Sequence, residues 1–223
     1  MAYHKTKEEL ESDNNWHFIE LTNMPINVPK LIKWHNTVLE TMPHLRFGMD
    51  RTDLVKTGIL KNMLIGSMHS FGLSWPVEQD LPIPPKYAAR PNLYPETLVD
   101  DFVFGSQMKV MERYKFGYFK ELFDLYGEDF LSWSRITIHD AGAKIDPHED
   151  TEVGSSMYRI HIPIITNEDA MFYWGETGYN LKVGKAYLIN TSITHNTHNK
   201  GSITRSHLIA HPANVEWILE NLV

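Results

Sequence analysis

One segment of the chain reads Met157-Tyr158-Arg159-Ile160-His161-Ile162-Pro163-Ile164-Ile165, in which bulky apolar residues recur at every second position. Successive side chains of a β-strand point to opposite faces of a sheet, so this period of two predicts a strand. The strand places on one face Tyr158, Ile160, Ile162 and Ile164. It places Arg159 and His161 side by side on the other face, together with Pro163.

Further short apolar runs lie on both sides of this segment. They are residues 134–139, 170–174, 179–183, 185–190 and 204–211. The turn residues 175–178, between the second and the third of these runs, favour a hairpin. Strand-like runs spaced by about 8–12 residues are typical of an all-β sandwich or barrel. A short helix is expected over 214–222.

The first 130 residues have a different character, since helical periodicity alternates there with proline-rich loops. Apolar residues recur at helical spacing over 28–42 and 105–126, which predicts two helices. Gly117 is a weak point or a break in the second helix, and Gly127 suits its C-terminal cap. The six prolines of 75–96 predict an irregular connection.

Composition limits the classes of function. The chain has 223 residues, 42% of them hydrophobic, which suffices for one large domain and excludes a wholly disordered chain. Its 28 acidic residues against 21 Lys and Arg give a net charge of -7, so nucleic acid and anionic membranes are poor partners by bulk electrostatics. The lack of cysteine excludes disulfides, thiolate zinc sites, iron–sulfur clusters and cysteine nucleophiles.

Residues 1–9 lack the apolar core of a secretion signal, and no run approaches the roughly 20 apolar residues of a membrane span. The lack of cysteine is compatible with a reducing compartment. We therefore expect a cytoplasmic protein that binds neither nucleic acid nor membrane. The sequence does not indicate the oligomeric state.

Seven of the twelve histidines lie after residue 138, so we looked for a metal site made of histidine and carboxylate. His148 and Asp150 stand two residues apart, and an extended strand presents both to one ion while Glu149 points away. Such a pair is common by chance. A second histidine from a distant strand would complete a face of two histidines and one carboxylate, which leaves about three positions open on Fe(II).

The segment 190–209 supplies a candidate for that histidine. His195 stands at the start of a predicted strand, and Arg205 follows ten residues later inside the next one. Arginine is a permanent, forked donor for carboxylates. One end of a dicarboxylate cosubstrate could therefore bind the metal while its far carboxylate reaches Arg205. The alternative for Arg205 is a salt bridge at the rim of the domain.

Several stretches in this part of the chain match one known family. They are residues 138–142, 147–148, 158–164 and 184–190, and the spacing of His195, Asn199 and Arg205. Over residues 135–211 they resemble the aspartyl/asparaginyl β-hydroxylase family of Fe(II)/2-oxoglutarate-dependent dioxygenases. The resemblance implies a mainly β fold with flanking helices and a double-stranded β-helix core, which is a cupin-like jelly roll.

With this resemblance we expect a single oxygenase domain in three parts. A helical and loop-rich N-terminal extension spans 1–130, the double-stranded β-helix core spans 131–213, and a C-terminal helix spans 214–223. The resemblance does not extend to the first 130 residues.

By the same resemblance, three residues are the ligands of Fe(II): His148, Asp150 and His195. Animal members that act on peptides lack the carboxylate. Bacterial hydroxylases of free amino acids, such as proline cis-hydroxylases, keep it, so Asp150 favours the bacterial branch. Because the segment 149–157 is longer than is usual in the family, Glu152 is a second candidate for the carboxylate. His198 is a second candidate for the histidine ligand that His195 is expected to supply.

The resemblance also implies the cosubstrate and the reaction. Arg205 would bind the far carboxylate of 2-oxoglutarate, and Arg159 and His161 would contact the cosubstrate near its metal-bound end. With Fe(II), 2-oxoglutarate and O2, the enzyme would hydroxylate an unactivated C–H bond of a small amino-acid-like or peptidyl substrate and release succinate and CO2. The segments 75–96 and 149–156 are expected lids.

The alternative is a non-redox cupin, either a metal-dependent isomerase or a ligand-binding module. Such a site often includes a third histidine, and His161 or His207 could supply it. Among the remaining polar residues, His139 is expected to be structural, while His207 could line the pocket. His211 is expected at the surface. Arg135 could meet an anionic substrate, but a surface charge is the stronger expectation.

Overall fold

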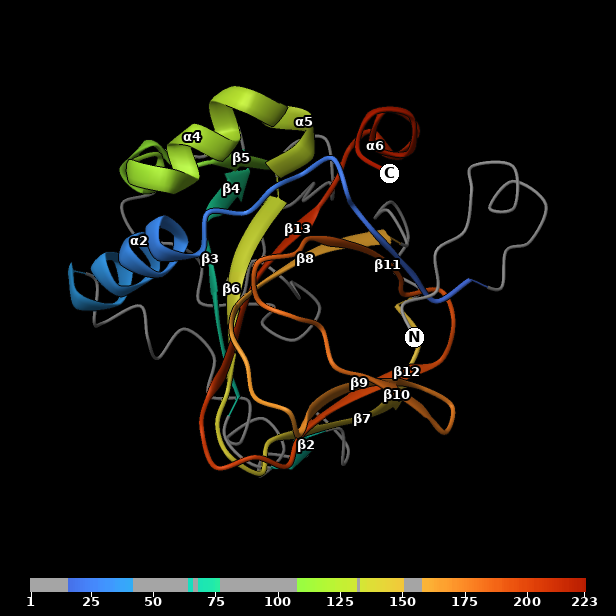
Figure 1. The fold of residues 1–223 in the computed structure, drawn as a ribbon. Helices are drawn as coiled ribbons and strands as arrows, with labels where there is room; N and C mark the ends of the chain where they lie inside the picture. Colours follow the sequence, from blue (N-terminus) through green and yellow to red (C-terminus); the bar gives the residue numbers. More distant parts are fainter. Residues whose placement is uncertain (1–15, 42–63, 66–67, 77–107, 132, 151–157) are drawn as a thin grey trace.

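The structure is a computed structural model, and it describes residues 16–41, 64–65, 68–76, 108–131, 133–150 and 158–223. Within these ranges two large antiparallel sheets face each other, and helices lie along the outside of one of them (Figure 1). No helix in these ranges has the length and apolar character needed to span a membrane. Glu152 and most of the two predicted lids, 75–96 and 149–156, lie outside the described residues.

Eight consecutive strands build the core. They are β6 (Trp133–His139), β7 (Lys144–His148), β8 (Tyr158–Ile165), β9 (Ala170–Trp174), β10 (Thr177–Tyr179), β11 (Tyr187–Asn190), β12 (His195–Asn199) and β13 (Arg205–His211). Four form one sheet in the order β11-β8-β13-β6, and four form the facing sheet in the order β10-β9-β12-β7. The chain changes sheet after almost every strand, so the strands wind into a double-stranded β-helix. The predicted jelly-roll core is confirmed.

Residues before 130 also contribute strands, which the prediction of a helical extension did not include. In the larger sheet, β1 (Phe18–Glu20) lies beside β11 and β3 (Met68–Gly72) lies beside β6. In the smaller sheet, β2 (Leu64–Ile65) pairs with β7. β4 (Ser74–Pro76) pairs with β5 (Met108–Val110). These short strands form against distant partners, and the periodicity within a segment does not report such pairing.

The helix predicted over 105–126 is wrong in its first half. β5 occupies part of this range, and a 3-10 turn, η4 (Glu112–Tyr114), follows it. Helix α4 (Gly117–Tyr126) begins at Gly117, whose φ of 53° lies in the left-handed region that glycine adopts without strain. Gly127 caps the helix, and its N–H donates to the carbonyl of Phe123 at 3.0 Å.

Helices cover the outer face of the larger sheet (Figure 1). α2 (Val28–Thr41) and α4 pack there, α5 (Glu128–Leu131) follows α4, and α6 (Val215–Asn221) ends the chain. The layer between them is made of buried apolar side chains, among them Leu31, Trp34, Phe119, Leu122, Ile136, Ile138, Ile160, Ile162 and Leu208. Trp34 and Phe119 stack with ring centroids 4.8 Å apart. The apolar face predicted for 158–164 is thus the helix-facing one.

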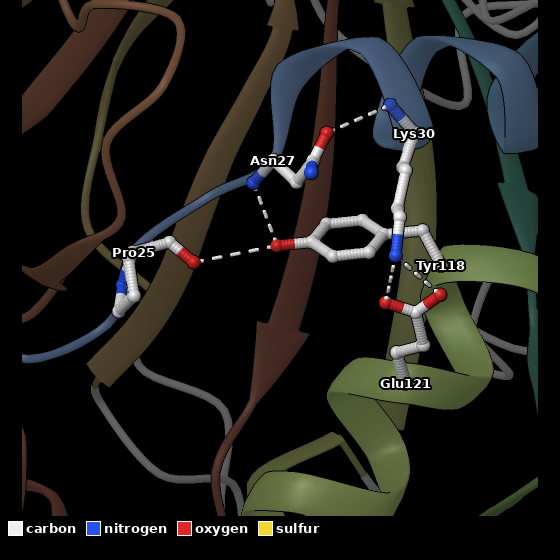
Figure 2. A network of polar contacts seen from close by, with 5 residues as sticks. All are labelled: Pro25, Asn27, Lys30, Tyr118 and Glu121. Carbon is white, nitrogen blue, oxygen red and sulfur yellow. Dashed lines mark hydrogen bonds and ion pairs between the residues drawn. The ribbon is translucent and has the colours of Figure 1, made fainter.

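Polar contacts fix helix α2 on helix α4 (Figure 2). The hydroxyl of Tyr118 accepts a hydrogen bond from the N–H of Asn27 at 2.7 Å and donates to the carbonyl of Pro25 at 3.3 Å. Asn27 also caps α2, because its Oδ1 accepts from the N–H of Lys30 at 3.2 Å. Lys30 Nζ lies 2.8 Å from Glu121, a half-exposed pair that adds little stability by itself.

The inward face of the larger sheet is polar. Cross-strand pairing places on it Arg135, Thr137 and His139 from β6, Arg159 and His161 from β8, and Arg205, His207 and His211 from β13. This face looks toward the smaller sheet, since His161 meets Phe172 of β9 edge to face with centroids 5.7 Å apart. The fold therefore keeps its main apolar layer outside the barrel, under the helices, and holds polar groups inside it.

We expect Phe119→Ala to lower the free energy of unfolding by about 3–5 kcal/mol, because it removes a fully buried ring from the layer under α4. The matched control is Leu125→Ala in the same helix. The Leu125 side chain is 71% exposed, and its loss should change stability by less than about 0.5 kcal/mol. Urea unfolding followed by circular dichroism measures both values, and equal effects would contradict the packing of α4 on the sheet.

Candidate metal centre

The three residues predicted to bind metal lie together at the ends of β7 and β12. β7 ends at His148, β12 begins at His195, and the two residues are direct partners in the antiparallel ladder. Their ring centroids are 4.4 Å apart. Asp150 lies just beyond β7, with its Oδ1 3.9 Å from His148 Nε2. One potential ligand atom from each residue lies within 4.8 Å of the other two, so a single ion could contact all three.

Backbone contacts hold these residues in place. The N–H of Asp150 donates to the carbonyl of Thr191 at 3.0 Å, which ties the chain after β7 to the segment before β12. The register of β12 on β7 shifts between His195 and Thr197, as it does at a β-bulge. Bulges re-aim side chains next to functional sites, and this one lies beside His195.

Both imidazoles present the same nitrogen to the common point. His148 Nδ1 lies 2.8 Å from the carbonyl of Asp146, and His195 Nδ1 lies 2.9 Å from the carbonyl of Ile193. A carbonyl only accepts, so each Nδ1 carries the proton and each Nε2 keeps its lone pair. This is the arrangement by which metal-binding histidines are oriented by a second hydrogen bond.

Charge and burial set the protonation of the group. Burial raises the pKa of the Asp150 carboxyl, but Arg159, whose NH2 lies 3.4 Å from Oδ2, and other nearby cations outweigh it and hold the pKa below its usual value. Burial lowers the pKa of His195, and the neighbouring His148 lowers it further. At neutral pH the group offers a carboxylate and a neutral imidazole, which are the forms that bind metal ions.

A second feature of this interior is the buried guanidinium of Arg205 on the inward face of β13. Its NH1 donates to His139 Nδ1 at 3.2 Å, and its NH2 donates to His207 Nδ1 at 3.1 Å. Among the described residues no carboxylate forms an ion pair with it. Burial lowers the pKa of Arg205 to about 9, so it stays cationic at neutral pH. A buried cation with only neutral neighbours suits an anionic ligand.

Two polar atoms beside Arg205 have no hydrogen-bond partner in the described part of the chain. They are Thr137 Oγ1 and His207 Nε2, on directly opposed residues of β6 and β13. Since arginine only donates, His207 Nδ1 accepts and the ring proton sits on Nε2. Burial, and then the charge of Arg205, hold the pKa of His207 well below its usual value. We call Arg205, His207 and Thr137 the carboxylate cradle, because they offer one cation and two donors in one patch.

Arg159 and His161 lie on the inward face of β8, as their spacing predicts, and connect the two features. Arg159 contacts Asp150, while His161 Nδ1 lies 3.4 Å from His207 Nδ1. Burial, followed by the charge of Arg205, holds the pKa of His161 well below its usual value, so the ring is neutral. Contact of Arg159 or His161 with a cosubstrate stays a prediction.

Other residues considered from the sequence lie apart from this group. His198 occupies the opposite face of β12 from His195 and is not part of it. Asn199 is structural, since its Nδ2 donates to the carbonyls of His139, Asp140 and Ile203 at 2.9–3.0 Å. The sequence alone did not predict the support that His139 and His207 give Arg205. The available signal was their position on paired strands.

Two expectations about surface residues are wrong. His211 is only 4% exposed, because β13 continues through it and pairs it with Trp133 of β6. Arg135 is half-buried rather than exposed, and it lies on the inward face of β6. Both side chains therefore belong to the interior of the barrel.

A sequence model of the family described as aspartyl/asparaginyl beta-hydroxylase matches residues 120–212. The matched range includes all eight strands of the core and the three clustered residues at β7 and β12. Residues 120–212 are thus similar to this hydroxylase family. The family and the enzyme class predicted from the residues are thereby confirmed. Among curated proteins, none matches the chain.

Some solved structures are partly similar to this chain. A prolyl-4-hydroxylase from Pseudomonas putida shares 6% identity over 90% of this chain and 95% of its own, with a TM-score of 0.42. An oxidoreductase of the 2OG-Fe(II) oxygenase family from Burkholderia pseudomallei shares 10% identity with this chain. The likeness covers 82% of this chain and 91% of that one, with a TM-score of 0.37. A predicted oxalate decarboxylase from Thermotoga maritima shares 12%, and the likeness covers 36% of this chain and 64% of that one, with a TM-score of 0.30. Because these TM-scores are low, the assignment of the fold rests on the strand order, and the similarity to the family rests on the sequence match.

We expect His148→Ala and His195→Ala to weaken the binding of Mn(II), a redox-stable substitute for Fe(II), by about 100-fold or more, because each removes an imidazole ligand. The matched control is His198→Ala, which removes a histidine of the same strand outside the group and should bind as the unmodified protein does. Isothermal calorimetry on the folded variants measures the affinity. Unchanged binding in both ligand variants would show that the metal, if any, sits elsewhere.

Proposed function

We propose that this protein is an Fe(II)/2-oxoglutarate-dependent dioxygenase that hydroxylates an unactivated C–H bond of a small amino-acid-like or peptidyl substrate and releases succinate and CO2. The hydroxylase family domain supports the type of reaction. The observation that carries the proposal is Arg205, a buried cation among neutral imidazoles, in the same interior as the His148, Asp150 and His195 group. A cosubstrate that binds metal at one end and has a carboxylate at the other fits both features.

His148, Asp150 and His195 would hold the iron. Two imidazole nitrogens and one carboxylate oxygen suit Fe(II), although other divalent metals accept the same donors. Three ligands on one face of an octahedral ion leave positions for cosubstrate and O2. The backbone hydrogen bonds at both Nδ1 atoms orient the rings in advance, and Arg159 keeps Asp150 ionised.

The carboxylate cradle would bind the distal carboxylate of 2-oxoglutarate. Arg205 supplies the charge, and the Nε2–H of His207 and the hydroxyl of Thr137 supply two further donors that have no partner among the described residues. Arg159 and His161 would contact the cosubstrate near the metal. When bound with O2, iron and 2-oxoglutarate supply the oxidising power for C–H hydroxylation, and the cosubstrate leaves as succinate and CO2. The chain orients these groups and shields them from bulk water.

The competing function, a non-redox cupin, has less support. Its site would add a further histidine to the metal ligands, and His161 and His207 were the candidates. Within the described residues neither belongs to the group of potential ligands at His148, which has three members. His207 instead accepts a hydrogen bond from Arg205. A cupin that binds metal alone also gives no reason for a buried guanidinium.

The purified protein should convert 2-oxoglutarate to succinate with Fe(II) and O2, and a substrate from a panel of amino acids should accelerate this. Arg205→Met should raise KM for 2-oxoglutarate by about 100-fold or more, because it removes one partner of a buried charge pair. Mn(II) affinity should not change. Arg113→Met, which removes an exposed arginine of η4, is the matched control. No succinate from the unmodified protein, or an unchanged KM in Arg205→Met, would overturn the proposal.

His207 gives a finer test of the cradle. His207→Phe keeps a ring but removes both nitrogens, so KM for 2-oxoglutarate should rise by about tenfold, the effect of one lost charge-assisted hydrogen bond. His207→Gln should recover part of this loss, because an amide can accept from Arg205 and also donate to the cosubstrate. Initial rates of succinate formation measure both variants. Equal KM values in the two variants would mean that His207 only fills space.

A further inference from the structure

His35 is a buried polar residue in the apolar layer between helix α2 and the larger sheet. It is 2% exposed and stands on the same stripe of α2 as the buried Leu31, Trp34 and Val38. Its Nε2 lies 2.9 Å from the hydroxyl oxygen of Ser206, a residue of β13 that is 1% exposed. A polar pair in such a layer costs desolvation that two apolar side chains would avoid. Packing alone therefore does not explain this pair.

The hydrogen-bond partners of the His35 ring define its orientation. Nδ1 lies 3.2 Å from the side-chain oxygen of Asn36, which only accepts, so Nδ1 carries the proton. In the neutral ring Nε2 then accepts from the hydroxyl of Ser206. Helix α2 is thereby joined to β13 at one defined point on the outer face of the sheet, by a bond between residues 171 positions apart in the chain.

Ser206 stands between two members of the carboxylate cradle. Its neighbours in β13 are Arg205 and His207. Because side chains alternate along a strand, both of these point to the inner face while Ser206 points to the helices. Ser206 therefore does not contact a cosubstrate in the interior itself. A displacement of its backbone, however, would change how Arg205 and His207 lie relative to each other, so its hydroxyl is placed to act on the cradle from behind.

The strand pairing around Ser206 is irregular on one side. With β6, β13 pairs without a break over its whole length. With β8, the register shifts between Ser206 and His207, as it does at a β-bulge. His207 lies opposite Pro163, which has no N–H to donate to β13. The ladder therefore fixes the backbone at Ser206 less firmly than a regular one would, and the bond to His35 supplies a further constraint at this point.

We infer that His35 is a positioning residue for the carboxylate cradle, and that helix α2 holds the cradle in its binding geometry through the bond between Ser206 and His35. The inference rests on the proposed function, since it concerns the site for the distal carboxylate of 2-oxoglutarate. Forked hydrogen bonds from a guanidinium to a carboxylate depend on geometry, so a cradle that is held less rigidly binds the cosubstrate more weakly. Helix α2 lies outside the matched residues 120–212, so the N-terminal part of the chain contributes to the site.

Binding measured without turnover tests the inference. The protein is loaded with Mn(II) in the absence of O2 and titrated by calorimetry with 2-oxoglutarate. His35→Leu and Ser206→Ala should each weaken 2-oxoglutarate binding by about fivefold, the effect of roughly one ordinary hydrogen bond. The loss should be smaller than in Arg205→Met, because the guanidinium itself remains. Mn(II) affinity should stay within about twofold in both variants, since neither residue belongs to the metal group.

Two more variants separate positioning from packing. The double variant His35→Leu with Ser206→Ala replaces the polar pair by apolar side chains, so its free energy of unfolding should not be lower than that of either single variant. Its 2-oxoglutarate affinity should still be about fivefold below that of the unmodified protein, because both changes remove the same bond. His35→Gln should recover part of the affinity lost in His35→Leu, since an amide can hydrogen-bond the hydroxyl of Ser206.

Val38→Ala is the matched control for stability. It removes buried apolar atoms from the same stripe of α2 and should lower the free energy of unfolding. It leaves the bond between His35 and Ser206 in place, so 2-oxoglutarate affinity should stay within about twofold of that of the unmodified protein. Urea unfolding followed by circular dichroism measures the stability of every variant beside its affinity.

The outcomes distinguish this inference from the proposed function. If the unmodified protein does not bind 2-oxoglutarate, the proposed function is wrong and the inference falls with it. If it binds, but His35→Leu and Ser206→Ala bind equally well, the inference alone is wrong. An equal loss of affinity in Val38→Ala would also overturn the inference, because the effect would then follow stability. Should His35→Leu not fold, Ser206→Ala decides, since it removes a single oxygen atom.

Discussion

The ladder between β7 and β12 is the contact on which the candidate site depends. It sets His148 directly opposite His195, two residues that are far apart in the chain, and the bond between Asp150 and Thr191 adds the carboxylate. Strand pairing fixes Cα positions within narrow limits, so the rings need little rearrangement to meet one ion. A shift of either strand by one residue would turn the histidine of that strand to the outer face and abolish the site.

The larger sheet separates stability from chemistry by its two faces. Its outer face packs Ile136, Ile160 and Leu208 under the helices, and this apolar layer supplies the main stabilisation. Its inner face can therefore hold buried histidine and arginine, which contribute little to stability and cost desolvation. The helices that precede the core are needed for this arrangement, since without them the outer face would be exposed and the polar interior could not support the sheet.

Local patterns predicted the core and a cluster of His148, Asp150 and His195, but not what depends on distant pairing. The alternation of residues 158–165 and the spacing of His148 and Asp150 are short-range signals. The structure has a strand over 158–165 and brings His148 and Asp150 together, as these signals indicate. β5 was predicted as helix because its apolar residues fit either period, and only its pairing with β4 decides. His211 precedes a proline and was placed at the surface. Its burial follows from pairing with Trp133, which no local pattern contains.

The choice of histidine around Arg205 explains how a buried cation stays available to a ligand. An aspartate or glutamate beside the guanidinium would neutralise it and occupy its fork. Two neutral imidazoles satisfy one N–H of each terminal nitrogen at 3.2 and 3.1 Å and leave the charge in place. Burial helps, because it holds the pKa of His207 well below its usual value and so disfavours a second positive charge beside the first.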